Sequence, residues 1–232
     1  MPTIPVEIKL TGILFILQGL FDVIGIFGGT FDPVHNGHLQ TVLHVQQHLG
    51  LEKVHLIPVG QAVHRQQPQA SAEQRLQMLQ AATENHPELI IDDREIRREG
   101  GSYTYHTLRS IKAEHPQQTL CLITGSDAFS HFAGWYMPEQ ILQMAHLIVM
   151  RRPDEQVIPN ASLQQILDKH LTDNIDSLQQ NRQGRIIFLD VPQIPISSTL
   201  IRENLAADKS IDNLLPLSVQ TLIADWQLYR SN

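Results

Sequence analysis

Residues 26–39 read IFGGTFDPVHNGHL, and they carry the clearest local signal for the fold. An apolar run ends in Gly28 and Gly29, and a helix is expected to begin near His35. Glycines let backbone N–H groups approach an anion closely, and a helix start adds free N–H donors and the positive end of its dipole. This stretch therefore predicts a strand, a phosphate-binding loop and a helix in succession.

Two histidines are expected on the first turn of that helix. His35 and His38 are three residues apart, so their imidazoles share one face and can donate to the same phosphate group. A histidine pair at this spacing can also begin a zinc site, but zinc needs three or four ligands and no partner spacing is evident. Four other histidines are expected to be surface or packing residues: His44, His48, His55 and His86.

Short apolar runs alternate with segments of helical period along the rest of the chain. This alternation is typical of a parallel sheet covered by helices. The sequence therefore predicts an α/β fold, a doubly wound parallel sheet with the ligand cleft at the carboxyl ends of the strands. The predicted strands are 23–27, 54–59, 89–91, 120–124, 147–150 and 186–191.

Local signals predict several helix ends. The helix that starts near His35 is expected to end at Gly50, where a C-terminal glycine belongs. Ser71 and Gln74 form a capping box ahead of a second helix. Residues 197–205 and 218–229 have helical patterns, so the chain is expected to close with a small helical tail.

Composition limits the classes of function. A chain of 232 residues with 42% hydrophobic residues suits one globular domain. A net charge of -7 argues against nucleic acid as a partner, because such proteins usually carry a broad basic patch. With Cys121 as the only cysteine, neither an intramolecular disulfide nor a cysteine-based zinc site can form. A reducing compartment, the cytoplasm, is the expected location.

The apolar stretch at 10–21, LTGILFILQGLF, suggests a membrane anchor or a signal peptide at first sight. It is too short to cross about 30 Å of hydrocarbon. A signal peptide would have a basic start and a small-residue cleavage site, whereas Glu7 precedes Lys9 here. We expect no membrane association, and interpret residues 1–22 as a surface-packed extension or the product of a misassigned start codon, ahead of a single domain at 23–232.

Two further helix starts are suited to anions. Ser197 and Ser198 lie at a predicted helix start, with Arg202 one turn later, so hydroxyls, free N–H groups and a planar guanidinium converge. The segment Ser102-Tyr103-Thr104 follows two glycines and opens another helix. An ordinary helix cap remains the alternative interpretation of the Ser-Ser-Thr run.

Other polar residues follow predicted strands directly. Gly125 and Asp127 come just after the fourth strand, where the Asp127 carboxylate could accept hydrogen bonds from ribose hydroxyls. Arg151 and Arg152 follow the fifth strand and could add positive potential over phosphates. A solvated surface pair is an equally reasonable interpretation of these arginines.

The block GGTFDPVHNGHL at 28–39 resembles the HxGH signature of the nucleotidyltransferase superfamily of modified Rossmann folds. The whole block is similar to that of bacterial nicotinate-nucleotide adenylyltransferases. The resemblance extends from about Ile24 to Arg230. Four further blocks follow in the order of that family: His64-Arg65, Ser102-Tyr103-Thr104, Gly125-Ser126-Asp127 with Trp135-Tyr136, and ISSTLIR at 196–202.

The resemblance implies a reaction of ATP with nicotinate mononucleotide that gives nicotinate adenine dinucleotide and pyrophosphate, with Mg²⁺ bridging the triphosphate. It implies that His38 stabilises the α-phosphate and that the 196–202 segment binds the triphosphate. It further implies that the Ser102–Thr104 turn receives the nicotinate carboxylate and that Trp135 stacks on the pyridine ring, although a tryptophan is more often a core residue. The remaining implied contacts are Gly28, Gly29, Thr30, Phe31, His35, His64 and Arg65.

One departure from the family pattern lies just before His64-Arg65, where Ala62-Val63 replaces the usual proline, so the placement of Arg65 is less certain by resemblance. Two rivals are a pantetheine-phosphate adenylyltransferase and a cytidylyltransferase, and the Ser102–Thr104 turn and Trp135 argue against both. A third rival is a nucleotide sensor without turnover. Such a sensor should have lost part of the charged set, which is intact here. Oligomeric state leaves no signal in the sequence.

Overall fold

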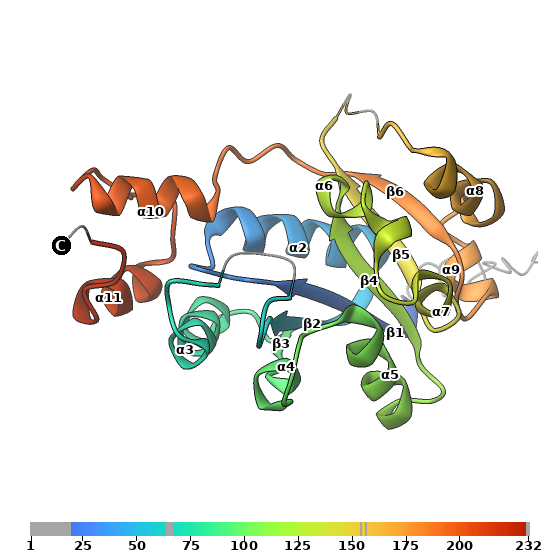
Figure 1. Ribbon diagram of the computed structural model, residues 1–232, viewed down its shortest axis with the longest axis horizontal. Helices are drawn as coiled ribbons and strands as arrows, with labels where there is room; N and C mark the ends of the chain where they lie inside the picture. Colours follow the sequence, from blue (N-terminus) through green and yellow to red (C-terminus); the bar gives the residue numbers. More distant parts are fainter. Residues whose placement is uncertain (1–19, 64–66, 154, 156, 231–232) are drawn as a thin grey trace, which may run out of the picture.

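The computed structural model describes residues 20–63, 67–153, 155 and 157–230. Its centre is a six-stranded sheet in the order β3-β2-β1-β4-β5-β6 (Figure 1), and every neighbouring pair is parallel. The predicted doubly wound α/β fold is confirmed. The strands are β1 (Leu20–Gly29), β2 (Leu51–Pro58), β3 (Leu89–Ile91), β4 (Thr119–Gly125), β5 (His146–Arg151) and β6 (Ile186–Asp190).

Helices cover both faces of this sheet. Figure 1 shows α2 on one face and α4 and α5 on the other, with α10 and α11 beyond the end of the sheet. None of the helices within the described residues is long and apolar enough to cross a membrane. The helices are α2 (Asn36–Leu49), α3 (Ala72–Thr83), α4 (Arg94–Arg97), α5 (Thr104–Glu114), α6 (Ser126–Phe129), α7 (Pro138–Leu142), α8 (Ala161–His170), α9 (Ser177–Gln180), α10 (Ser198–Ala206) and α11 (Leu217–Asp225), with a 3₁₀ turn, η1 (Phe132–Gly134).

The strand order reverses between β1 and β4. Connections from these two central strands leave in opposite directions, so their carboxyl ends diverge and open a crevice between them. The strands themselves are held by burial, since the side chains of β4 and β5 are almost entirely inaccessible. Such strands have no polar face, which explains why they appear in the sequence as continuous apolar runs.

Two helix-end predictions are confirmed. Gly50 adopts a left-handed conformation with φ 62°, and its N–H donates to the carbonyls of Gln46 and Gln47. Ser71 and Gln74 form both hydrogen bonds of the capping box ahead of α3. Helix α2 begins at Asn36, with His35 as its N-cap residue.

The two ends of the described chain differ from expectation. Strand β1 begins at Leu20 rather than near residue 23, because it pairs with Leu51 before a register shift. Helix α11 ends at Asp225 instead of near residue 229, and the positive φ values of Gln227 and Tyr229 turn the chain back on itself. The extension at 1–19 lies outside the described residues, so its interpretation stays a prediction.

Candidate active site

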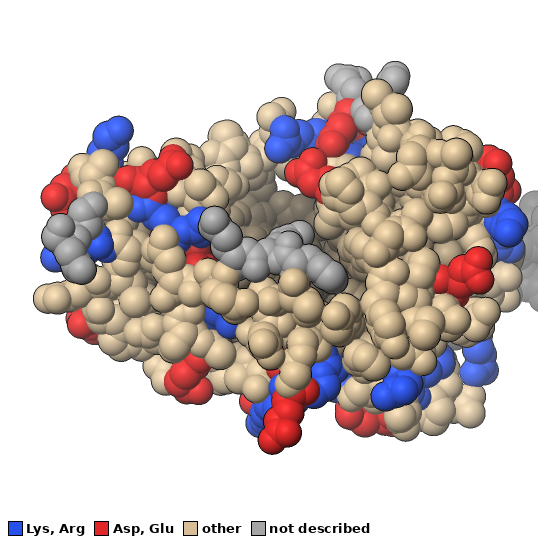
Figure 2. Space-filling model, viewed as in Figure 1, with Lys and Arg blue, Asp and Glu red and all other residues tan. Residues whose placement is uncertain are grey.

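A cleft of about 670 Å³ opens where the sheet order reverses. Figure 2 shows the surface hollowed between the parts of the molecule that carry α10 and α6. The lining combines the end of β1 with the start of α5 and the segment after α6, so motifs far apart in sequence meet here. Among the predicted residues, those in the lining are Gly28, Gly29, Thr30, Ser102, Tyr103, Thr104 and Trp135.

The other predicted phosphate residues that the structure describes gather around the next turn of the chain, beside the cleft rather than in its lining. The His38 ring packs edge-on against Phe31, with centroids 5.1 Å apart. Arg202 Nη1 donates to the carbonyl of Asp32 over 2.7 Å, and the Ser198 hydroxyl donates to the carbonyl of Pro33 over 2.9 Å. The starts of α2 and α10 therefore meet at the Phe31–Pro33 turn, one step along the chain from Gly28–Thr30.

Glycine is required at two close approaches in this loop. A Cβ at Gly29 would lie 2.8 Å from the Phe31 ring, and a Cβ at Gly37 would lie 2.9 Å from Nδ1 of His35. Both distances are shorter than real Cβ contacts. These two glycines of the GGTFDPVHNGH block are therefore needed because the loop packs tightly against the Phe31 and His35 rings.

His35 and His38 stack in parallel, with ring centroids 3.7 Å apart and an angle of 23° between the planes. Nδ1 of His35 accepts a hydrogen bond from the backbone N–H of His38, so the proton of the neutral ring lies on Nε2. Nδ1 of His38 is buried and has no hydrogen-bond partner among the residues that the structure describes. A buried bare nitrogen costs less than a buried unpaired N–H, so His38 also presents an Nε2–H donor.

Both histidines are neutral at neutral pH. Burial lowers the pKa of His35 to about 4. Burial, and then the charge of His35, lower the pKa of His38 well below its ordinary value. The pair can therefore donate two hydrogen bonds to a phosphate, and the compensating charge must come from elsewhere.

The pKa of His35 makes stability depend on pH. Because the folded-state pKa lies below the unfolded value, the stabilisation is fully present above about pH 6.5 and is lost as the pH falls towards 4. We expect the unfolding free energy to fall by on the order of 3 kcal/mol over this window. Urea unfolding of the wild-type chain and of His35→Asn, which keeps an N-cap acceptor, should give curves that converge below pH 6. Parallel curves would contradict this assignment.

The start of α2 offers fewer free donors than its sequence predicts. The N–H of Asn36 donates to the carbonyl of Leu214 over 3.0 Å, and the N–H of His38 is capped by His35. Gly37 is left as the first-turn amide without such a bond. A segment about 177 residues away covers this helix start, which no local pattern reveals.

The start of α10 differs in a similar way. Ser197 is the N-cap, and its hydroxyl oxygen accepts from the N–H of Leu200. The Ser198 hydroxyl donates to the carbonyl of Pro33, and its predicted contact with a phosphate stays a prediction. The amides of Ser198 and Thr199 are the first-turn donors that the helix does not use, beside the guanidinium of Arg202.

The Ser102–Thr104 turn, which is predicted to receive the nicotinate carboxylate, lies at the start of α5 and lines the cleft. Ser102 is committed to the fold, because its N–H donates to the carbonyl of Gln61 and its hydroxyl accepts from the N–H of Gly60. The Ser102 amide is therefore not among the donors that the turn offers to a ligand, and the substrate contact of Ser102 stays a prediction. Thr104 and Tyr105 carry the first-turn amides that α5 leaves for a ligand.

Trp135 is both part of the core packing and part of the cleft lining, and its stacking on a pyridine ring stays a prediction. One part of its ring packs edge-on against the buried Phe132, with centroids 5.3 Å apart, and the residue also lines the cleft. Next to it, Tyr136 packs against Tyr103 at 5.1 Å and against Tyr105 at 5.7 Å. This aromatic contact joins the Trp135 loop to the start of α5.

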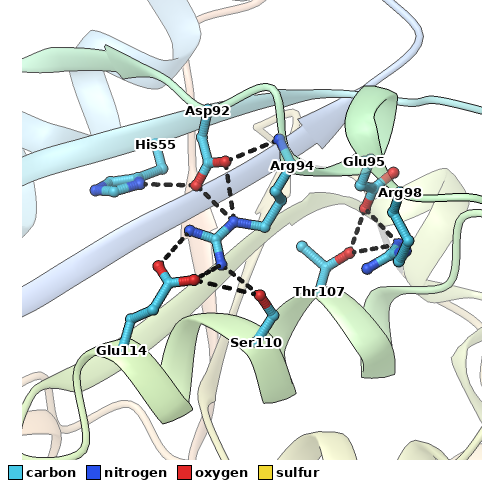
Figure 3. A network of polar contacts seen from close by, with 8 residues as sticks. All are labelled: His55, Asp92, Arg94, Glu95, Arg98, Thr107, Ser110 and Glu114. Atoms are coloured by element: carbon cyan, nitrogen blue, oxygen red, sulfur yellow. Dashed lines mark hydrogen bonds and ion pairs between the residues drawn. The ribbon is translucent and has the colours of Figure 1, made fainter.

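Polar contacts hold α4 and α5 against the sheet edge (Figure 3). Arg94 binds Asp92 through Nε and binds Glu114 and Ser110 through its terminal nitrogens. Burial alone would raise the pKa of Asp92, but hydrogen bonds from His55 and Arg94 outweigh it and lower this pKa to about 2. These residues border an open hollow of about 1090 Å³; Asp92 and Glu114 already compensate the Arg94 charge there.

A second group in Figure 3 lies closer to the cleft. The Thr107 hydroxyl donates to Oε1 of Glu95 over 2.5 Å and accepts from Nη2 of Arg98 over 3.1 Å. Glu95 is itself part of the cleft lining. Oε1 of this carboxylate is thus engaged by the α5 side chain.

The remaining predicted residues have mixed outcomes. Gly125 and Asp127 follow β4 at the expected edge, but neither is in the cleft lining. The Phe31 side chain is only 1% exposed and packs against His38, and its predicted substrate contact stays a prediction. Arg152 is exposed after β5. His64 and Arg65 lie outside the described residues.

Sequence analysis missed several lining residues. Val59 and Thr124 end the predicted strands 54–59 and 120–124, so the rule that ligands bind at carboxyl strand ends could have found them. Others belong to segments without a local motif and reach the cleft only through the fold. They include Glu95, Ser130, His131 and Asn160.

Comparison with known proteins places this geometry in a family. The family model described as Cytidylyltransferase-like matches residues 26–204. The nicotinate-nucleotide adenylyltransferase of Salmonella typhimurium is 42% identical over 207 residues, which cover 88% of this chain and 97% of that relative. The chain belongs to the nicotinate-nucleotide adenylyltransferase family. This membership decides against the two rivals from elsewhere in the nucleotidyltransferase superfamily.

Solved structures support the nucleotidyltransferase fold at lower identity. The nicotinic acid mononucleotide adenylyltransferase of Plasmodium falciparum complexed with NaAD has a TM-score of 0.69 at 17% identity. The same protein complexed with APC has a TM-score of 0.66 at 18% identity. In both cases the alignment covers 90% of this chain and 97% of the other.

Proposed function

We propose that this chain transfers the adenylyl group of ATP to nicotinate mononucleotide and so forms nicotinate adenine dinucleotide and pyrophosphate in NAD biosynthesis. One observation carries the proposal. The loop from Gly28 to Pro33 has the aromatic cleft at its first residues and the starts of α2 and α10 at its last ones. A pyridine nucleotide on the first side and a triphosphate on the second would place the two reacting phosphates at the same loop.

The chemistry needs positioning more than proton transfer. An oxygen of the mononucleotide phosphate attacks the α-phosphorus of ATP in line, the bond from that phosphorus to the bridging oxygen breaks, and pyrophosphate leaves with its electrons. The attacking phosphate is already an anion, so no general base is required. Neutral His35 and His38 suit this reaction as fixed donors to the charge that develops on the α-phosphate.

The positive charge at the phosphates would come from the arginines. Arg202 lies at the start of α10, where Nη1 donates to the carbonyl of Asp32 and Nη2 donates to the hydroxyl of Thr199 over 3.3 Å, and its further N–H groups would donate to a phosphate. The role of Arg65 rests on the resemblance alone. Thr30, in the cleft lining, would add a hydroxyl and an amide next to the reacting phosphates.

Magnesium would enter as part of the ATP complex. No group of three or more His, Cys, Asp or Glu side chains suited to a metal occurs among the residues that the structure describes. The ion would therefore be held mainly by the triphosphate oxygens, where it offsets charge and orients the leaving group.

The cytoplasm is the proposed location. Cys121 is buried, and burial raises the pKa of its thiol to about 12, so it is unreactive rather than poised for oxidation.

The experiment that tests the proposed function is pyrophosphate release from MgATP on addition of nicotinate mononucleotide. Formation of the dinucleotide in equal amount is the expected result. A chain that binds ATP without releasing pyrophosphate would be the non-catalytic sensor. Release with phosphopantetheine or a cytidine nucleotide instead would overturn the substrate assignment.

A further inference from the structure

The Asp32 carboxylate is buried in the turn before α2, with 4% of the residue exposed. Its oxygens accept from the N–H of Gln69 over 2.8 Å and from the N–H of Ala70 over 3.1 Å. The Tyr229 hydroxyl donates to the Oδ1 atom over 2.7 Å. One carboxylate therefore joins the phosphate loop to the segment before α3 and to a residue near the end of the chain.

Asp32 also binds Arg202, the arginine proposed to contact the triphosphate, through its backbone. The carbonyl of Asp32 accepts from Nη1 of Arg202 over 2.7 Å. On the other side of the loop, the buried Arg75 donates to the carbonyls of Thr30 and Val59, each over 2.8 Å. The orientation of Asp32 thus sets where the Arg202 guanidinium lies relative to Thr30.

Tyr229 has an unfavourable backbone conformation. Its φ of 62° is a left-handed conformation, which is unfavourable for a residue with a Cβ. The residue is only 7% exposed and packs in the hydrophobic core. Burial and the adjacent Asp32 carboxylate raise the pKa of the hydroxyl, so it stays protonated and donates.

We propose that Tyr229 is a positioning residue for the triphosphate, because its hydroxyl fixes the Asp32 carboxylate and the Asp32 carbonyl in turn fixes Arg202. The inference rests on the proposed function only in taking Arg202 as a triphosphate ligand. Tyr229 lies outside the HxGH and ISSTLIR blocks, so the proposal gives a further segment of the chain a part in ATP binding.

The direct test is Tyr229→Phe, which removes only the hydroxyl. Loss of one buried hydrogen bond to a charged group should weaken MgATP binding about tenfold by calorimetry. The KM for nicotinate mononucleotide should change less than about twofold, since the pyridine cleft is built by other segments. General destabilisation of the fold would affect both KM values, whereas loss of triphosphate positioning should raise the KM for ATP alone.

A matched control is Ser218→Ala. The Ser218 hydroxyl donates to the carbonyl of Ala81 over 3.0 Å and ties α11 to α3, so it anchors the same tail without touching Asp32. This variant should bind MgATP within about twofold of wild type. If both variants weaken ATP binding alike, Tyr229 serves only to dock the tail, and the proposal is overturned.

A double-mutant cycle tests the route through Arg202. In an Arg202→Ala background, Tyr229→Phe should change ATP affinity by less than about twofold, because the group that it positions is already gone. Additive losses would show that Tyr229 does not act through Arg202 and would overturn the proposal.

Asp32→Asn provides a second route if Tyr229→Phe does not fold. The amide keeps one acceptor oxygen but places an NH₂ against the amides of Gln69 and Ala70 or the Tyr229 hydroxyl, so the same ATP-specific loss is expected. Normal ATP affinity in a folded Asp32→Asn protein would contradict the inference. A wild-type chain that binds no ATP would overturn the proposed function as well, and is recognised before any variant is compared.

Discussion

Replacement of His38 by alanine is expected to lower kcat by about two to three orders of magnitude while the fold is kept, as for loss of one preorganised donor in a transition state. The structure gives the reason. Nδ1 of His38 is buried and has no partner within the described part of the chain, which favours the tautomer with the proton on Nε2, and the ring is supported by the stacked His35 and the edge of Phe31. Steady-state turnover, with a thermal melt for each protein, measures the effect.

His44→Ala is the matched control for this prediction. His44 lies on the same helix, α2, and stacks only against His48 at 5.9 Å, so its removal should leave kcat within about twofold of wild type. Near-normal turnover in a folded His38→Ala protein would sink the mechanism. An equal loss in His44→Ala would instead indicate that α2 as a whole has been disturbed.

The parts of the fold that could be predicted are those with local causes. Apolar runs bounded by polar residues gave six strands because a parallel sheet buries both of its faces. Gly50 and the Ser71–Gln74 capping box gave helix ends because the relevant hydrogen bonds span only three or four residues. The cleft at the carboxyl ends followed from the sheet topology alone.

The parts that could not be predicted depend on contacts between distant segments. The amide of Asn36 was expected to face an anion, but the carbonyl of Leu214 occupies it. The hydroxyl of Ser198 was expected to bind phosphate, and its hydrogen bond to the carbonyl of Pro33 was not predicted. In each case the residue type was informative, while its partner was set by tertiary packing that has no sequence periodicity.

The same limit applies to the supporting residues. Thr107 and Glu95 are twelve residues apart on separate helices, and nothing in their spacing predicts that one holds the other. Tyr229 was expected to end a helix, whereas the chain turns inward after Asp225 and brings its hydroxyl to Asp32. Polar networks of this kind become visible only once the backbone is known.

The enzyme is expected to prefer nicotinate mononucleotide over nicotinamide mononucleotide by at least about 100-fold in kcat/KM. The two substrates differ only in a carboxylate against a neutral amide. The first-turn amides of Thr104 and Tyr105 and the dipole of α5 favour a carboxylate, whereas the NH₂ of an amide would face donors. Oε1 of Glu95, a carboxylate in the described lining, already accepts from Thr107, which leaves less acceptor capacity for that NH₂. Competition of the two substrates at equal concentration measures the ratio.

Trp135→Ala separates this preference from general pyridine binding. The indole ring offers the same stacking surface to both substrates, since they share the pyridinium ring, so its loss should raise both KM values and leave the acid-to-amide ratio within about threefold of wild type. A collapse of the ratio in this variant would mean that the tryptophan loop, and not the α5 start, reads the substituent. If the wild-type chain adenylylates the amide as fast as the acid, the α5 amides do not select the carboxylate, and the enzyme is one of dual specificity.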